Sequence, residues 1–223
     1  MDLENIISKI IQNRLFLRLK NVVENSPFHD HEKVYDHLIK TKDIAQREIK
    51  GKFITNLDAK KLFLEYVNQD FDGCKRAEIM IIAALLHDIG KILYVKQRGF
   101  CRSIKITDSQ EQTTIPGHEY WGSTIADNFL NEFKLTSEQI KYISSIIRLH
   151  DCFQGPYFPS KTDWNLEKII NDIKSRAEGM YIESMFNNFC DVYNSIPFQS
   201  YKETVINIFN NPSLYEPREY IIP

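Results

Sequence analysis

Apolar residues recur at helical spacing along most of the chain. In residues 3–24, Ile6, Ile10 and Val22 lie near one face of a helix, and other apolar side chains join them. Spacings of three and four residues predict amphipathic helices. The same spacing predicts helices over residues 3–24, 32–49, 57–68, 75–89, 118–133, 137–150, 164–177, 180–194 and 199–210. Alternation typical of strands is scarce, so we expect an all-α fold.

The helix over residues 75–89 differs from the others because it is apolar almost all round, from Ile79 to Leu86. Such a helix is expected to lie at the centre of a bundle. Gly90 suits its C-terminal end. Thr136, followed three residues later by Gln139, predicts a capping box that starts another helix.

Residues 95–116 interrupt the helical pattern with a long polar segment. Connections of this length usually form a functional flap or a small ordered insert. Cys101–Thr107 could form one arm of a hairpin. The prolines Pro212, Pro217 and Pro223 predict an irregular C-terminal tail.

Composition excludes several classes of protein. The chain has 223 residues, of which 43% are hydrophobic and 26% charged, as expected for one globular domain. The formal net charge of −2 gives no electrostatic indication of a nucleic-acid partner. The four cysteines are scattered and predict reduced thiols. No secretory signal and no apolar run of about 18 residues is seen. We therefore expect a cytoplasmic protein with no membrane partner; no pattern indicates an oligomeric state.

The run Leu85-Leu86-His87-Asp88-Ile89-Gly90-Lys91 carries the main chemical signal. It places adjacent His and Asp at the end of the apolar helix. A buried carboxylate beside an imidazole is costly unless a cation satisfies it. A divalent metal would do so.

Three further histidines, His37, His118 and His150, lie at the end or on the inward face of other predicted helices. Each alone has a simpler explanation, as a core imidazole or a surface residue. Together with His87 and Asp88 they indicate a metal site, because helical bundles build such sites from inward His and carboxylate side chains. His29 and His31 lie in a polar stretch, and we expect them to be solvated.

The order His37, then His87-Asp88, then a later Asp resembles the HD-domain superfamily of metal-dependent phosphohydrolases. The strip 83–91 is close to its signature. The segment 116–126 is similar to a Gly-His-Glu segment of several branches, including the HD domain attached to bacterial tRNA nucleotidyltransferases. The segment 146–151 matches the helix end where that branch places another His. The resemblance covers about residues 30–195. It implies one HD-like helical bundle, with an N-terminal helix in 1–29 and a helix and tail in 196–223.

The resemblance also implies a set of ligands. A first metal would be held by His37, His87, Asp88 and a late aspartate. We take Asp191 for that aspartate, with Asp172 and Asp151 as alternatives. A second metal would be bound by His118 and His150, which would hold phosphate oxygens if only one metal is present. Such ligands suit Mn²⁺, Fe²⁺, Co²⁺, Ni²⁺, Mg²⁺ or Zn²⁺ without choosing among them.

The activity that the resemblance implies is hydrolysis of a small phosphate mono- or diester, such as a nucleotide or cyclic nucleotide. The metal would lower the pKa of a bound water and polarise the phosphoryl oxygens. Asp88 would orient the water, and Lys91 and Arg148 would neutralise phosphate charge. Arg98 and Arg102, in the polar segment, would contact a substrate phosphate.

Two other functions fit the same residues. Some HD-fold proteins hold two irons with this ligand order and activate dioxygen, as myo-inositol oxygenase does. Iron content and O₂ consumption would indicate that class. A helical domain that binds a nucleotide without turnover is the second alternative. The Gly-His-Glu segment and the complete ligand set favour hydrolysis.

Overall fold

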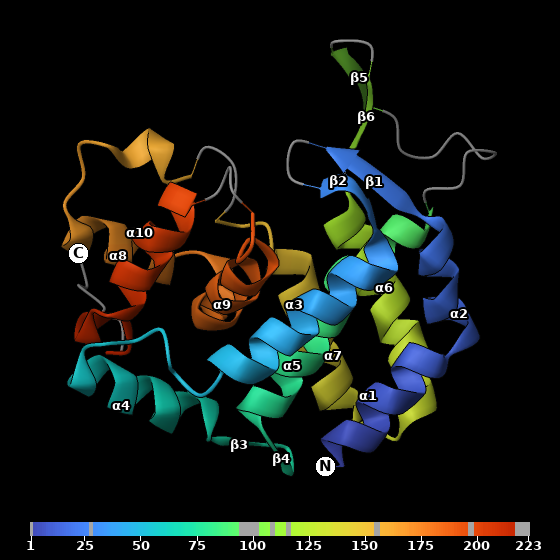
Figure 1. The fold of residues 1–223 in the computed structure, drawn as a ribbon. Coiled ribbons are helices and arrows are strands. Elements are labelled where there is room, and N and C mark those ends of the chain that lie inside the picture. The colour runs from blue at the N-terminus through green and yellow to red at the C-terminus, as the bar shows by residue number, and fades with distance from the viewer. Residues whose placement is uncertain are drawn as a thin grey trace.

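Helices carry almost all of the fold, as the sequence pattern predicts (Figure 1). The computed structural model describes residues 2–26, 29–93, 103–107, 110–114, 117–153, 157–195 and 199–216. Within these ranges the strands form only two-stranded antiparallel hairpins, so the fold is all-α. The α-helices are α1 (Leu3–Gln12), α2 (Arg14–Leu17), α3 (Val34–Glu48), α4 (Leu57–Val67), α5 (Arg76–Leu86), α6 (His118–Phe129), α7 (Ser137–Leu149), α8 (Leu166–Lys174), α9 (Tyr181–Asp191) and α10 (Gln199–Phe209).

Helix α5 lies at the centre, as its apolar sequence predicts. Every residue from Ile79 to Leu86 is buried. Helices α3, α7 and α9 all pack against it (Figure 1). A 3-10 turn, η2 (Ile89–Leu93), continues the chain beyond α5 and packs against α6. The C-terminal end of α5 is therefore enclosed on several sides by other helices.

The outer helices lie on two sides of this centre. In Figure 1, α1 and α2 lie on the side of α6, and α4, α8 and α10 lie on the opposite side. On the latter side a cluster of aromatic rings joins α4, α9 and α10. Its ring centroids are 6.0 Å apart for Phe63 and Phe186 and 5.8 Å apart for Phe63 and Phe209. None of the helices in the described ranges is long and apolar enough to cross a bilayer.

The prediction of one helix over residues 3–24 is wrong beyond Gln12. Asn13 has extended backbone angles, and its side chain accepts a hydrogen bond from the Leu15 amide. The chain continues through α2 and the 3-10 turn η1 (Arg18–Asn21) into a hairpin of β1 (Val23–Ser26) and β2 (His29–Lys33). A side chain that caps the backbone competes with helix continuation, and this overrides the apolar periodicity. His29 and His31 belong to β2.

Part of the polar segment forms an ordered insert. Strands β5 (Ser103–Thr107) and β6 (Gln110–Thr114) pair as an antiparallel hairpin, so the predicted hairpin arm is confirmed for residues 103–107. The hairpin projects beyond the helices in Figure 1. Arg98 and Arg102 lie outside the described residues, so their predicted contact with a substrate phosphate stays a prediction. The short hairpin of β3 (Asp70–Phe71) and β4 (Cys74–Lys75) precedes α5.

Local signals for helix ends are confirmed at several points. Thr136 caps α7, and both hydrogen bonds of the capping box with Gln139 are present. The break between the predicted helices 164–177 and 180–194 is a 3-10 turn, η5 (Ala177–Gly179), in which Gly179 has a φ of +86°. Helix α6 ends earlier than predicted, at Phe129, and continues as the 3-10 turn η3 (Leu130–Phe133).

A buried ion pair ties α5 to α9. Arg76 Nη1 lies 2.8 Å from Glu183 Oε1, and Tyr66 donates a hydrogen bond of 2.5 Å to the same oxygen. Tyr142 on α7 also donates to it. The Glu183 side chain is fully buried. Loss of one partner leaves an uncompensated buried charge, which typically costs 3–5 kcal/mol.

We expect Glu183→Gln to lower the free energy of unfolding by about 3 kcal/mol, because Arg76 then lacks its counter-charge. Urea unfolding followed by circular dichroism measures this. The matched control is Glu178→Gln, which removes a carboxylate from an exposed pair with Arg148. This control should cost about 1 kcal/mol or less. Equal losses for the two variants would contradict the prediction.

Candidate metal centre

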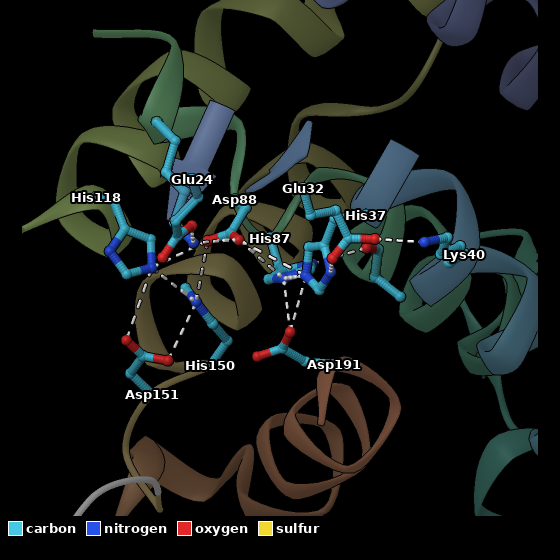
Figure 2. A network of polar contacts seen from close by, with 12 residues as sticks. Glu24, Glu32, His37, Lys40, His87, Asp88, His118, His150, Asp151 and Asp191 are labelled. Carbon is cyan, nitrogen blue, oxygen red and sulfur yellow. Dashed lines mark hydrogen bonds and ion pairs between the residues drawn. The ribbon is translucent and has the colours of Figure 1, made fainter. Parts of the chain in front are cut away.

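Six side chains from five helices converge at the ends of α5 and α7 (Figure 2). His87 and His150 are the residues that follow α5 and α7, and Asp88 comes next after His87. His118 is the first residue of α6, and Asp191 is the last residue of α9. His37 comes from the interior of α3. These are the six residues that the sequence nominates, and the fold brings all of them together.

The first group surrounds the end of α5. His37 Nε2 lies 3.3 Å from His87 Nε2 and 2.8 Å from Asp191 Oδ1. His87 Nε2 lies 3.5 Å from Asp191 Oδ1 and 3.4 Å from Asp88 Oδ2. The side chains of this group are almost closed to solvent, with exposures between 0% and 11%.

The second group lies on the other side of Asp88. His118 Nε2 is 3.2 Å from His150 Nε2. Asp88 Oδ1 lies 3.0 Å from His118 Nε2 and 3.9 Å from His150 Nε2. One oxygen of Asp88 therefore faces the first histidine pair and the other oxygen faces the second pair. A single carboxylate joins the two groups.

The orientation of the imidazoles leaves the same nitrogen of each ring facing the centre. His87 Nδ1 donates to the Ala84 carbonyl at 2.9 Å, and His150 Nδ1 donates to the Ile147 carbonyl at 2.6 Å. The Nδ1 atoms of the other two rings face carboxylates, Glu32 at 3.5 Å from His37 and Glu119 at 3.4 Å from His118. In a neutral ring with its proton on Nδ1, Nε2 presents a lone pair. All four lone pairs then point inward, as partners behind metal-bound histidines arrange them.

The charges of the site also favour a cation. Burial opposes ionisation of Asp88, but Lys91, His87 and His118 outweigh it and hold the Asp88 pKa well below its usual range. Burial likewise opposes ionisation of Asp191, and His87 and His37 lower its pKa. Burial lowers the pKa of His87, yet Asp88 and Asp191 raise it to about 10. Both carboxylates are thus ionised, and without a metal they draw protons onto a buried ring.

These residues fit a divalent metal. Among the described residues, Asp88 Oδ1 accepts no hydrogen bond of ordinary geometry, although it is buried. Buried polar atoms are nearly always satisfied, and an ion is one way to satisfy them. Ligand atoms of His37, His87 and Asp88 lie within 4.8 Å of one another, as do those of Asp88, His118 and His150. Imidazole nitrogen with carboxylate oxygen suits first-row divalent ions.

The structure gives Lys91 a clear partner that the sequence does not reveal. Lys91 Nζ donates to Asp88 Oδ2 and to Glu24 Oε2, both at 2.6 Å, and its side chain is only 7% exposed. Glu24 belongs to β1, which the sequence pattern predicts as helix, so no local signal pointed to it. Glu32 and Glu119 are further contributors that sequence reasoning missed.

Of the other nominated residues, Asp172 and Arg148 bind partners outside the six side chains, and Asp151 lies beside the second group. Asp172 accepts hydrogen bonds from Tyr157 and Arg176 and pairs with Lys161. Arg148 donates to Glu178 at the surface. Asp151 lies beside the second group, with Oδ1 at 3.2 Å from His150 Nε2. Of the three late aspartates considered from the sequence, Asp191 is the one that contacts His37 and His87.

Comparison with known proteins identifies the family of this helical domain. The HD domain family model matches residues 34–168, which is more than half of the chain. The matched range includes His37, His87, Asp88 and the second histidine pair, whereas Asp191 lies beyond it. No match is found among curated proteins. The length of the family match leads to one conclusion: the chain belongs to the HD-domain family.

Proposed function

We propose that the protein is a metal-dependent phosphohydrolase that cleaves a small phosphate mono- or diester, with a nucleotide or cyclic nucleotide as the substrate class. The family supplies the general expectation of metal-dependent hydrolysis. The single observation that carries the proposal further is the position of Asp88, whose two oxygens face two separate histidine pairs at the end of the central helix.

The chain's residues divide into three roles. His37, His87, Asp88 and Asp191 would hold the first ion, and His118 and His150 would hold a second ion or phosphate oxygens. When bound, such an ion activates water and polarises the phosphoryl group. Lys91 holds Asp88 in place through a hydrogen bond to Oδ2, which leaves Oδ1 to face the second group.

Two of the cationic side chains that the sequence nominates for the substrate, Lys91 and Arg148, have acidic partners in the structure. The Lys91 ammonium is already neutralised by Glu24 and Asp88, so its contribution is to position Asp88 rather than to meet phosphate directly. Arg148 would have to leave Glu178 to reach a substrate. Arg98 and Arg102 stay predictions from the sequence.

The test is hydrolysis by protein that has been stripped with a chelator and reloaded with Mn²⁺, Co²⁺ or Ni²⁺. Under argon, we expect phosphate release or ring opening from nucleoside monophosphates or cyclic nucleotides, with rates that return on reloading. Elemental analysis of the purified protein should show a divalent metal. Stripped protein should have little activity.

The oxygenase alternative gives a different result in the same experiment. It predicts iron in the purified protein and O₂ consumption with no anaerobic turnover. Nucleotide binding without any turnover, in the presence of each metal, would favour the non-catalytic alternative. Either of these outcomes would contradict the proposed hydrolysis.

A further inference from the structure

We propose that Asp151 is a protein ligand of a second metal position, which it completes together with His118, His150 and the shared Asp88. The inference rests on the proposed metal-dependent function. It gives each ion two histidines and two carboxylates, with Asp88 common to both. It also predicts the order in which the two positions bind metal, because the second position is more open to solvent.

The ends of α5 and α7 repeat the same three residues. Leu86-His87-Asp88 follows one pattern, and Leu149-His150-Asp151 follows it again. In both cases the histidine caps the helix in a right-handed helical conformation. In both cases its Nδ1 donates to the carbonyl three residues earlier. The aspartate that follows therefore starts from the same local geometry at each helix end.

The carboxylate of Asp151 spans the second histidine pair. Its Oδ1 lies 3.2 Å from His150 Nε2, and its Oδ2 lies 3.7 Å from His118 Nε2 (Figure 2). Those are the two nitrogens that face the centre. Glu119, the other acid nearby, lies 3.4 Å from His118 Nδ1, and one of its oxygens is also within 4.8 Å of an Asp151 oxygen. Asp191 has a comparable position at the first pair, where its Oδ1 contacts Nε2 of both His37 and His87. Each histidine pair therefore has one aspartate of its own beside the inward nitrogens.

Charge balance favours Asp151 as a ligand of the second ion. Two divalent ions bring four positive charges, and Asp88 and Asp191 supply two negative charges. The second position would then have only a shared carboxylate. Adding Asp151 provides each ion with its own anionic oxygen, and charged oxygen ligands strengthen the binding of hard divalent ions such as Mn²⁺.

Exposure separates the two positions. In the first group, His87 is fully buried and Asp191 is 11% exposed. In the second group, His118 is 14% exposed and Asp151 is 34% exposed. Water reaches the second position more easily, so its ion should bind more weakly and exchange faster. Manganese should therefore load in two steps, first at the buried position.

The experiment is a Mn²⁺ titration of chelator-stripped protein, followed by calorimetry and by the electron paramagnetic resonance signal of free Mn²⁺. Wild-type protein should bind two ions per chain in two steps. Asp151→Asn should leave the tighter step unchanged and weaken the other by at least about 10-fold, since even partners behind the ligands contribute 10–100-fold to metal affinity. Asp151→Glu keeps a carboxylate and should restore most of the second step.

Two controls make the result specific. Asp127→Asn removes the same charge from an exposed position on α6 and should bind two ions as wild type does. Glu119→Gln should weaken the second step less than Asp151→Asn does, because Glu119 faces Nδ1 of His118 rather than the Nε2 atoms that face the ion. Because Asp151 is partly exposed, its variants should retain wild-type helicity by circular dichroism.

The inference is overturned if Asp151→Asn binds two ions with wild-type affinities, or if Glu119→Gln weakens the second step more than Asp151→Asn does. Either result leaves the proposed hydrolysis standing. Conversely, wild-type protein that binds two ions but cleaves no phosphate ester contradicts the proposed function and leaves Asp151 as a ligand.

Discussion

Asp88→Asn is expected to empty both metal positions at once and to lower the hydrolysis rate by at least about 100-fold, which is the upper end of what partners behind the ligands contribute. The reason is that Asp88 offers one oxygen to each histidine pair. Asparagine keeps the shape but removes the negative charge. Among the residues that the structure describes, Lys91 then retains only Glu24 as a counter-charge. Elemental analysis and a phosphate-release assay on the reloaded variant measure both effects.

Two aspartate variants serve as comparisons. Asp191→Asn should empty only the first position, because Asp191 contacts only His37 and His87 among the six side chains. Asp172→Asn should keep full metal content, since its carboxylate binds Tyr157 and Arg176 away from the centre. Loss of metal in the Asp172 variant with retention in the Asp191 variant would show that the late ligand is misassigned.

Gly90→Ala is expected to cost more than about 3 kcal/mol of unfolding free energy, the upper end of ordinary overpacking. A Cβ at Gly90 would lie 2.0 Å from the His118 carbonyl oxygen and 2.6 Å from the Gly122 amide nitrogen. Both neighbours are backbone atoms, so no side chain can rotate away. Helix α6 would have to move off η2, and it carries His118. Urea unfolding and Mn²⁺ titration should both show a loss, with the second ion weakened more than the first.

Other glycines provide graded controls. Gly73→Ala meets nothing within 4 Å but has a φ of +80°, so only backbone strain of about 1–2 kcal/mol is expected. Gly122→Ala meets the Gly90 amide nitrogen and a methyl group of Ile147 at 3.2 Å and should fall between the two. A Gly90→Ala protein as stable as wild type would show that α6 is not held closely against η2.

An element can be predicted from the sequence when neighbouring residues determine it, and cannot when contacts between distant segments do. Helix α5 has an unbroken apolar run, and α7 has its Thr136 capping box, so both can be predicted from neighbouring residues. The first 33 residues cannot all be predicted in this way. Their apolar spacing continues past Gln12, yet the Asn13 side chain caps a new helix and β1 pairs with β2. Strand pairing depends on contacts between separate segments, which periodicity alone does not report.

The same division holds for the candidate site. The histidines were identifiable because an imidazole on an inward helical face, or directly after an apolar helix, is a local feature of the sequence. The late aspartate could not be identified in this way. Asp151 comes directly after a predicted helix, and Asp172 and Asp191 lie within predicted helices, so no local feature separates them. The contact of Asp191 with His37 and His87 arises from how α9 packs against α3 and α5.

The sequence by itself determined the all-α class, the central helix and the residue types that would gather at its end. These follow from local periodicity, helix-capping side chains and the cost of burying charge. Only the tertiary structure decided that Asp88 faces two histidine pairs, that Lys91 is held between Glu24 and Asp88, and that Asp151 lies beside the second pair. The physical reason is that the packing of distant helices sets which side chains meet, and each helix encodes only its own buried face.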